Sequence, residues 1–237
     1  MTTPQESARG SRRERPAKAA LSRESIVAVT LKLLDDGVDR LTMRRVAAEL
    51  DTGPASLYVY VRDTEELHTA VLEELLGASG LLETVTTGSG TPRQRLVDLL
   101  MRYIALLMRY PSVARVTAFS RPMGPNYVHL VEALLDLMVQ CGVPLPVAGW
   151  GVDLLLQQAE TTAVEQSARG DAVEGAEDAV QRAAIRTLVA AAPADLPHLV
   201  ALGEDLVSGE GADRGAWTFE VILNGLLSTS RPPGATH

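Results

Sequence analysis

Hydroxyl and guanidinium side chains gather between residues 42 and 62, with types and spacings suited to binding phosphate. Thr42 precedes a short helical pattern, where its hydroxyl can cap the helix and also face an anion. Tyr58, Tyr60 and Arg62 follow the next short pattern and can reach phosphates from its sides. This chemistry is recognition of a polyanion, with no bond made or broken.

The second of these two patterns opens with Pro54, Ala55 and Ser56, which are small or polar side chains. Such residues at the start of a helix allow it to approach the floor of the major groove of a duplex. Pro54 also suits a first turn, where its missing N–H costs nothing. Asp51-Thr52-Gly53 supplies a three-residue turn before it, so the two patterns form a candidate helix-turn-helix.

Other residues with catalytic or ligating potential are scattered. The four histidines form no i,i+4 pair, and none has a metal-site spacing to Cys141, so a metal site is not expected. The sequence has no nucleophile elbow, no P-loop and no dinucleotide-binding glycine loop. We therefore predict that the protein is not an enzyme and that it needs no metal and no cofactor.

The 237-residue chain has a net charge of −8, but its charge is unevenly distributed. Residues 1–62 carry 11 Lys+Arg against 8 Asp+Glu, a balance of +3, and the other 175 residues carry 11 against 22, a balance of −11. The split favours a small polyanion-binding module on an acidic body, although so modest a balance also arises by chance. Residues 1–20 are expected to be a disordered basic arm, which either contacts DNA or only aids solubility.

Composition indicates an ordinary globular protein, with 46% hydrophobic and 22% charged residues. A single cysteine excludes an internal disulfide and fits a reducing cytosol. No apolar run reaches the length of a membrane span, and no signal peptide is expected at the N-terminus. We expect a cytoplasmic protein without a membrane partner.

Apolar residues recur at helical spacing along the chain and no strand-like alternation occurs, so the predicted fold is all-α. Ser22 is expected to cap the first helix and Gly37 to end it, and Asp63 or Thr64 to cap the fourth. The expected helices after the first are 42–50, 54–60, 64–82, a segment around 96–110, 127–140, 147–168, 179–191, 196–207 and 214–230. The stretches 86–92 and 170–178 are expected to be a linker and a mobile segment.

The segment from Leu41 to Leu67, LTMRRVAAELDTGPASLYVYVRDTEEL, resembles the DNA-binding part of the TetR family of bacterial transcriptional regulators. The resemblance covers residues 22–76, and beyond them the chain is similar only in being helical. It implies an N-terminal three-helix DNA-binding domain joined to a larger helical domain that binds a ligand and dimerises. The expected division is an arm over 1–20, a helix-turn-helix domain over 21–63, and an effector-binding and dimerisation domain over 64–237.

Position by position, the resemblance implies that Thr42 and Tyr58 contact phosphates and that Arg44 reads a base edge. Tyr60 then corresponds to a backbone contact. Two residues depart from the family pattern: Asp51 replaces a common glycine, which suggests a side-chain cap, and Thr64 replaces a common lysine, whose charge Arg62 is expected to supply. The candidate DNA contacts are Thr42, Arg44, Pro54, Ala55, Ser56, Tyr58, Tyr60 and Arg62. Arg45 is expected to pair with Glu49 instead of reading DNA.

Polar and aromatic groups interrupt the apolar helical faces of the body, as expected where a mainly apolar pocket holds a few aimed polar groups. Most of these residues are expected to be core, surface or dimer-contact residues instead. They are Arg102, Tyr103, Tyr127, His129, Trp150, Gln157, Gln158, Glu160, Thr161 and Thr162. The candidate ligand contacts are Tyr103, His129, Gln157 and Thr161. The apolar residues 217–227, with 152–164, are expected to build a four-helix dimer interface, in which Leu223 is a contact.

The predicted protein is a homodimeric, ligand-responsive transcriptional regulator. In the leading interpretation it is a repressor that binds double-stranded DNA at an inverted-repeat operator and is released by a small-molecule effector. Alternatives are an activator, a ligand-independent repressor, or a helical small-molecule-binding protein with a vestigial DNA module.

Overall fold

The structure is a computed structural model and describes residues 21–38, 40–83, 88–120, 122–170, 176–191, 195–209 and 211–232. The described residues form helices and no strands, which confirms the all-α prediction. The basic arm and most of the mobile segment predicted at 170–178 lie outside the described residues. The helices are α1 (Arg23–Asp35), α2 (Met43–Glu49), α3 (Pro54–Leu57), α4 (Thr64–Ala78), α6 (Pro92–Met108), α7 (Pro111–Thr117), α8 (Pro125–Gln140), α9 (Leu145–Gly170), α10 (Ala176–Ala190), α11 (Pro197–Leu202), the 3-10 helix η1 (Gly203–Val207) and α12 (Gly211–Ser228).

The first helices begin where the sequence places their caps. The Ser22 hydroxyl accepts the Ser25 backbone N–H at 3.2 Å, and the Ser25 hydroxyl accepts the Ser22 N–H in return. The Thr42 hydroxyl accepts the Arg45 N–H at 3.2 Å, and Asp63 Oδ1 accepts the Glu66 N–H at 2.8 Å. Each cap satisfies backbone donors that the first turn of a helix leaves unpaired.

Two expected helix ends are wrong, and one helix was not expected. The α-helical part of α3 ends at Leu57, and residues 58–60 continue as a hydrogen-bonded turn, with Tyr60 N–H donating to Leu57 O. Helix α4 ends at Ala78 instead of continuing to residue 82, because Gly80 has φ of +65° and turns the chain. Sequence patterns predict no helix between 111 and 124, yet Pro111 starts α7.

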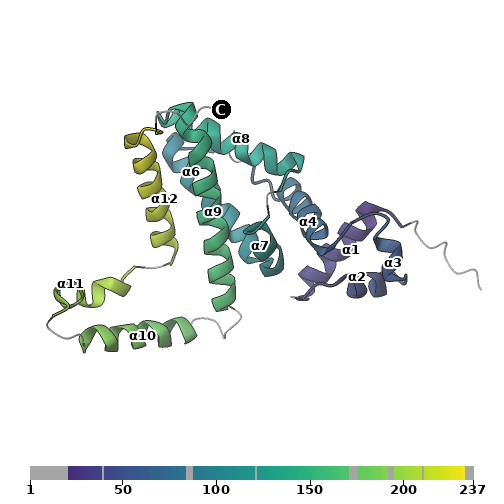
Figure 1. The fold of residues 1–237 in the computed structure, drawn as a ribbon, viewed down its shortest axis with the longest axis horizontal. Coiled ribbons are helices and arrows are strands. Elements are labelled where there is room, and N and C mark those ends of the chain that lie inside the picture. The colour runs from purple at the N-terminus through teal and green to yellow at the C-terminus, as the bar shows by residue number, and fades with distance from the viewer. Residues whose placement is uncertain are drawn as a thin grey trace, which may run out of the picture.

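Helices α1–α3 lie at one end of the molecule, α4 leads from them into the body, and α10 and α11 lie far from α1–α3 (Figure 1). In the body, α9 packs against α6, α7, α8 and α12. The core that joins these helices is mostly aliphatic, and α4 contributes to it through Leu67, Val71 and Leu75. Because α4 also packs against α1, α7 and α8, it contacts both the body and the small unit that α1, α2 and α3 form.

Candidate functional site

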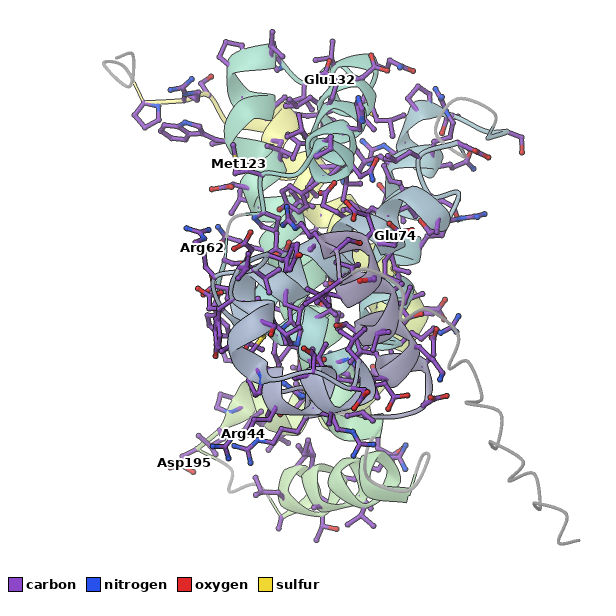
Figure 2. All side chains as sticks on the ribbon, turned by 90° about the vertical axis from the view of Figure 1, so that its right-hand side faces the viewer. Arg44, Arg62, Glu74, Met123, Glu132 and Asp195 are labelled. Atoms are coloured by element: carbon purple, nitrogen blue, oxygen red, sulfur yellow. The ribbon has the colours of Figure 1, made fainter. Side chains whose placement is uncertain are left out.

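The α2–α3 unit buries its apolar side chains and exposes the residues predicted to contact DNA. Val46 and Leu57 are fully buried and fix the two helices against each other. Thr42, Arg44, Pro54 and Ala55 are exposed, and Ser56 is half-buried. Figure 2 looks onto this end of the molecule and shows Arg44 projecting from it.

Two tyrosines after α3 face outward. The exposed fractions of Tyr58 and Tyr60 are 53% and 37%, whereas Val61 beside them is buried. The hydrogen-bonded turn at residues 58–60 permits this, because the chain leaves the helical spiral after Leu57. Both hydroxyls are thus presented on the same unit as Thr42 and Arg44.

Arg62 projects from the same end (Figure 2) but already has a partner within the chain. Its Nε donates to Glu66 Oε2 at 3.0 Å, and its backbone N–H donates to the same oxygen at 2.8 Å. These hydrogen bonds raise the pKa of Arg62 and lower the pKa of Glu66. For Arg62 to replace the charge missing at Thr64, its guanidinium would have to turn from Glu66 to a phosphate.

The expected pairing of Arg45 with Glu49 is wrong. Glu49 Oε1 lies 3.6 Å from Nζ of Lys32 in α1, so the carboxylate turns away from its own helix. Arg45 is exposed, and no described residue forms an ion pair with it. Sequence reasoning therefore missed a second cation beside Arg44, because an i,i+4 spacing cannot show competition from another helix.

Asp51 has the backbone conformation that the family pattern assigns to glycine. Its φ is +49°, in the left-handed region, and the Thr52 N–H then reaches back to Ala47 O at 2.9 Å. Aspartate tolerates this conformation better than most residues with a Cβ. Helix α2 therefore ends in the ordinary left-handed cap, and the backbone of Asp51 makes the turn.

The structure places the four predicted ligand contacts in two different environments. Tyr103 is fully buried in α6, whereas His129 in α8 and Gln157 and Thr161 in α9 are exposed. Contact of these residues with a ligand stays a prediction.

The partner of Tyr103 is a buried carboxylate that sequence reasoning placed among the polar groups on apolar helical faces, but not among its four candidate ligand contacts. Glu160 of α9 is 5% exposed, and its Oε1 accepts hydrogen bonds from the hydroxyls of Tyr103 at 3.2 Å and Tyr127 at 3.4 Å. Burial raises the pKa of Glu160 to about 7, even though the two phenols favour its charged form, and the charge of Asp153 raises it further. Burial likewise raises the pKa of Tyr103. The available signal was a lone glutamate on the apolar face of a long helix.

Tyr127 also connects this site to α4 through Glu73. The Glu73 carboxylate accepts the backbone N–H groups of Asn126 at 2.8 Å and Tyr127 at 3.0 Å, at the start of α8. Asn126 Nδ2 donates to Glu73 O at 2.9 Å. A Cβ at Gly124 would lie 2.0 Å from Glu73 Cδ, so a larger residue there would displace the Glu73 carboxylate from this position. A carboxylate of α4 thus caps the first turn of α8.

Asn126, one of the two residues capped by Glu73, borders a groove between α1, α4 and the segment that precedes α8. Its lining includes Arg62, Glu73, Glu74 and Met123, three of which are labelled in Figure 2. The groove is open and many of its lining residues are charged, unlike the buried surroundings of Glu160. The groove lies between α1 and the segment that precedes α8, beside the hydrogen bonds that Glu73 accepts.

Comparison with known protein families identifies the family of the body. Residues 86–230 match the family model described as "Tetracyclin repressor-like, C-terminal domain". The chain belongs to the TetR family of transcriptional regulators. Family membership thus rests on the body as well as on the N-terminal residues that resemble the DNA-binding segment.

Solved structures and curated relatives agree with this TetR-family membership. Transcription regulator SCO7704 of Streptomyces coelicolor has 42% identity and a TM-score of 0.73, over 92% of this chain and 100% of that one. ActR of the same organism, whose structure in complex with actinorhodin is known, has 30% identity and a TM-score of 0.70, over 89% of this chain and 98% of that one. The HTH-type transcriptional repressor DrrR1 of Streptomyces coeruleorubidus is 34% identical over 58% of this chain, which spans about half (50%) of DrrR1. These relatives are regulators rather than enzymes.

Two body helices of this TetR-family chain expose apolar stripes. Trp217 and Val221 on α12 are 68% and 47% exposed, and Trp150 and Leu154 on α9 are about half exposed. Leu223 is fully buried within the chain, so its expected role as a dimer contact is wrong. Periodicity identified the apolar helix but could not tell which of its faces packs inside the protomer.

No described helix is long and apolar enough to cross a membrane, and no cluster of metal-ligating side chains occurs among the described residues.

Proposed function

We propose that this TetR-family protein is a homodimeric repressor that binds an inverted-repeat operator through α2 and α3 and is released by a small-molecule effector. The observation that carries the proposal is the outward presentation of Thr42, Arg44 and Tyr58 from a unit whose inner face is buried. We place the DNA-binding domain at residues 21–63, the effector and dimer domain at 64–237, and the protein in the cytoplasm beside its DNA.

A dimer follows from the small size of the DNA-reading element. Helix α3 has four residues and can contact few base pairs, so specificity requires two copies on related half-sites about one helical turn apart. The exposed apolar stripes of α9 and α12 suit a twofold interface, because contiguous apolar surface of this kind marks an association site.

Release requires that the effector bind one conformation of the dimer better than another. The complex of ActR with actinorhodin supports a ligand site in the body of this chain as well. Helix α4 is placed to transmit the change, because it packs against α1 on one side and against α7 and α8 on the other. A shift of α4 would alter the spacing of the two α3 helices.

The proposal is tested by selecting bound duplexes from a random DNA pool with the ligand-free protein at physiological salt. We expect enrichment of an inverted repeat. Tyr58→Phe should weaken binding to specific and random DNA alike, because it removes a phosphate contact. Arg44→Ala should weaken the binding free energy for the specific site by about 1–3 kcal/mol and relax base preference at one position. Arg186→Ala, on exposed α10 far from α1–α3, is the control and should bind normally.

A folded dimer that enriches no sequence would overturn the repressor assignment and favour a small-molecule-binding protein. Equal losses on specific and random DNA for both variants would refute the division between phosphate contact and base reading.

A further inference from the structure

A buried carboxylate whose donors among the described side chains are two phenols lies where three body helices meet. Glu160 of α9 is enclosed by Tyr103 of α6 and Tyr127 of α8, and both phenols donate to Oε1. Among the described residues no side chain donates to Oε2, and none forms an ion pair with this carboxylate. Leu156 and Ala163, one helical turn before and after Glu160 on α9, are buried in the apolar core.

This arrangement stabilises neither the charged form of the Glu160 carboxylate nor the apolar core around it. Hydroxyl donors to a carboxylate usually approach to about 2.5–2.7 Å, and the two phenols are well beyond that. Burial therefore dominates, and Glu160 lies close to half protonation near neutral pH. An acid with a strongly shifted pKa and a specific environment is a candidate for ligand recognition.

We propose that Glu160 is the effector-recognition residue and that the effector carries a protonated amine on an apolar body. The proposal rests on the proposed function, since it names the chemistry of the effector that the repressor senses. An ammonium group supplies both the donors that Oε2 lacks and the opposite charge that the ionised carboxylate lacks. The aliphatic surroundings select an apolar remainder for the ligand.

The same geometry connects the effector to the DNA-binding unit. Tyr127 donates its hydroxyl to Glu160 and its backbone N–H to Glu73 of α4, so one residue connects the carboxylate with α4. An ammonium group that draws the carboxylate toward itself lengthens the bond from Tyr127, which is already 3.4 Å. The first turn of α8 then moves, and α4 moves with it through the Glu73 cap.

Calorimetry of the full-length protein with two matched probes tests the recognition step. The probes are 1-naphthylmethylamine and 1-naphthylmethanol, which share an aromatic body and differ in the cationic group. At pH 7 we expect roughly tenfold tighter binding of the amine, and release of about half a proton per amine bound, because an acid of pKa about 7 must ionise on pairing. Titration in two buffers of different ionisation enthalpy measures that proton.

Three variants make the test specific. Glu160→Gln, which keeps the size of the side chain, should bind both probes equally and release no proton. Tyr127→Phe should release more than half a proton, because the phenol it removes favours the charged carboxylate. Glu132→Gln, at an exposed glutamate of α8, should behave as the wild type. Thermal melting of each variant confirms that it is folded.

Equal affinity of the wild type for amine and alcohol, or no binding of the amine up to about 10 mM, would overturn the proposal, because a fragment of this size binds a matched site in the millimolar range or better. An amine preference that persists in Glu160→Gln would also overturn it. DNA selection is a separate measurement: enrichment of an inverted repeat without an amine preference leaves the repressor intact and removes only this inference.

Discussion

Replacing Glu160 by glutamine should change how the stability of the protein depends on pH. The carboxyl has a pKa of about 7 in the folded protein, against 4.5 for an unperturbed glutamate. Below pH 4.5 both states hold the proton, so the carboxyl does not affect stability. As pH rises toward 7, the unfolded chain loses this proton while the folded chain keeps it, so folding becomes less favourable.

The size of the effect follows from the pKa difference. A pKa unit corresponds to about 1.4 kcal/mol, so full ionisation of the unfolded chain destabilises the wild type by about 3 kcal/mol above pH 7. The side chain is 5% exposed, so solvent screening removes little of this. Glutamine carries no charge and lacks this loss, but its buried NH₂ group lacks a partner, which costs about 1–3 kcal/mol at every pH.

Because these two contributions are similar in size, the absolute stabilities at pH 8 should be close and the pH slope is the diagnostic quantity. Urea unfolding at pH 5, 6, 7 and 8 measures this slope, with the protein concentration held constant because the dimer that we propose would contribute to stability. The wild type should lose stability relative to Glu160→Gln by about 1 kcal/mol per pH unit between pH 5 and 7, and then run parallel to it. Parallel curves over the whole range would refute the buried, shifted carboxyl, and Glu132→Gln should follow the wild type throughout.

Four further variants test the fold and the assembly. Thr42→Ala should lower unfolding free energy by about 1 kcal/mol and weaken DNA binding, because the Arg45 N–H loses its cap; chemical unfolding and fluorescence anisotropy measure the two effects. Val221→Glu should give folded monomers without operator binding, whereas Leu223→Glu should fail to fold, and light scattering with circular dichroism separates the two; a folded Leu223→Glu monomer would show that this residue faces the partner. Gly151→Val should cost about 1–3 kcal/mol, because a Cβ there already lies 2.7 Å from Leu226 Cδ1 and a branched side chain pushes α12 away from α9; an unchanged melting temperature would contradict that packing.

The helix caps and buried positions of the DNA-binding unit can be predicted from sequence, because they depend on local interactions. Ser22, Thr42 and Asp63 cap their helices as expected, because capping is decided within a few residues. The inward positions Leu57 and Val61 also follow from a four-residue spacing. Even here, the bounds of α3 and α4 depended on backbone turns at residues 58–60 and at Gly80, which periodicity does not register.

For the body, the sequence predicted the helices but not which of their faces are buried. Leu223 and Val221 lie two residues apart on one apolar helix, yet the first is buried and the second exposed, because α6 and α9 cover only one side of α12. Tyr103 and Tyr127 lie 57 and 33 residues from Glu160 along the chain. Only the packing of α6, α8 and α9 brings the three side chains together. Sequence alone determined the all-α fold, the caps and the outward face of the helix-turn-helix, since these depend on short-range bonding and spacing. Tertiary structure decided which polar groups are desolvated together, because burial depends on neighbours from distant parts of the chain.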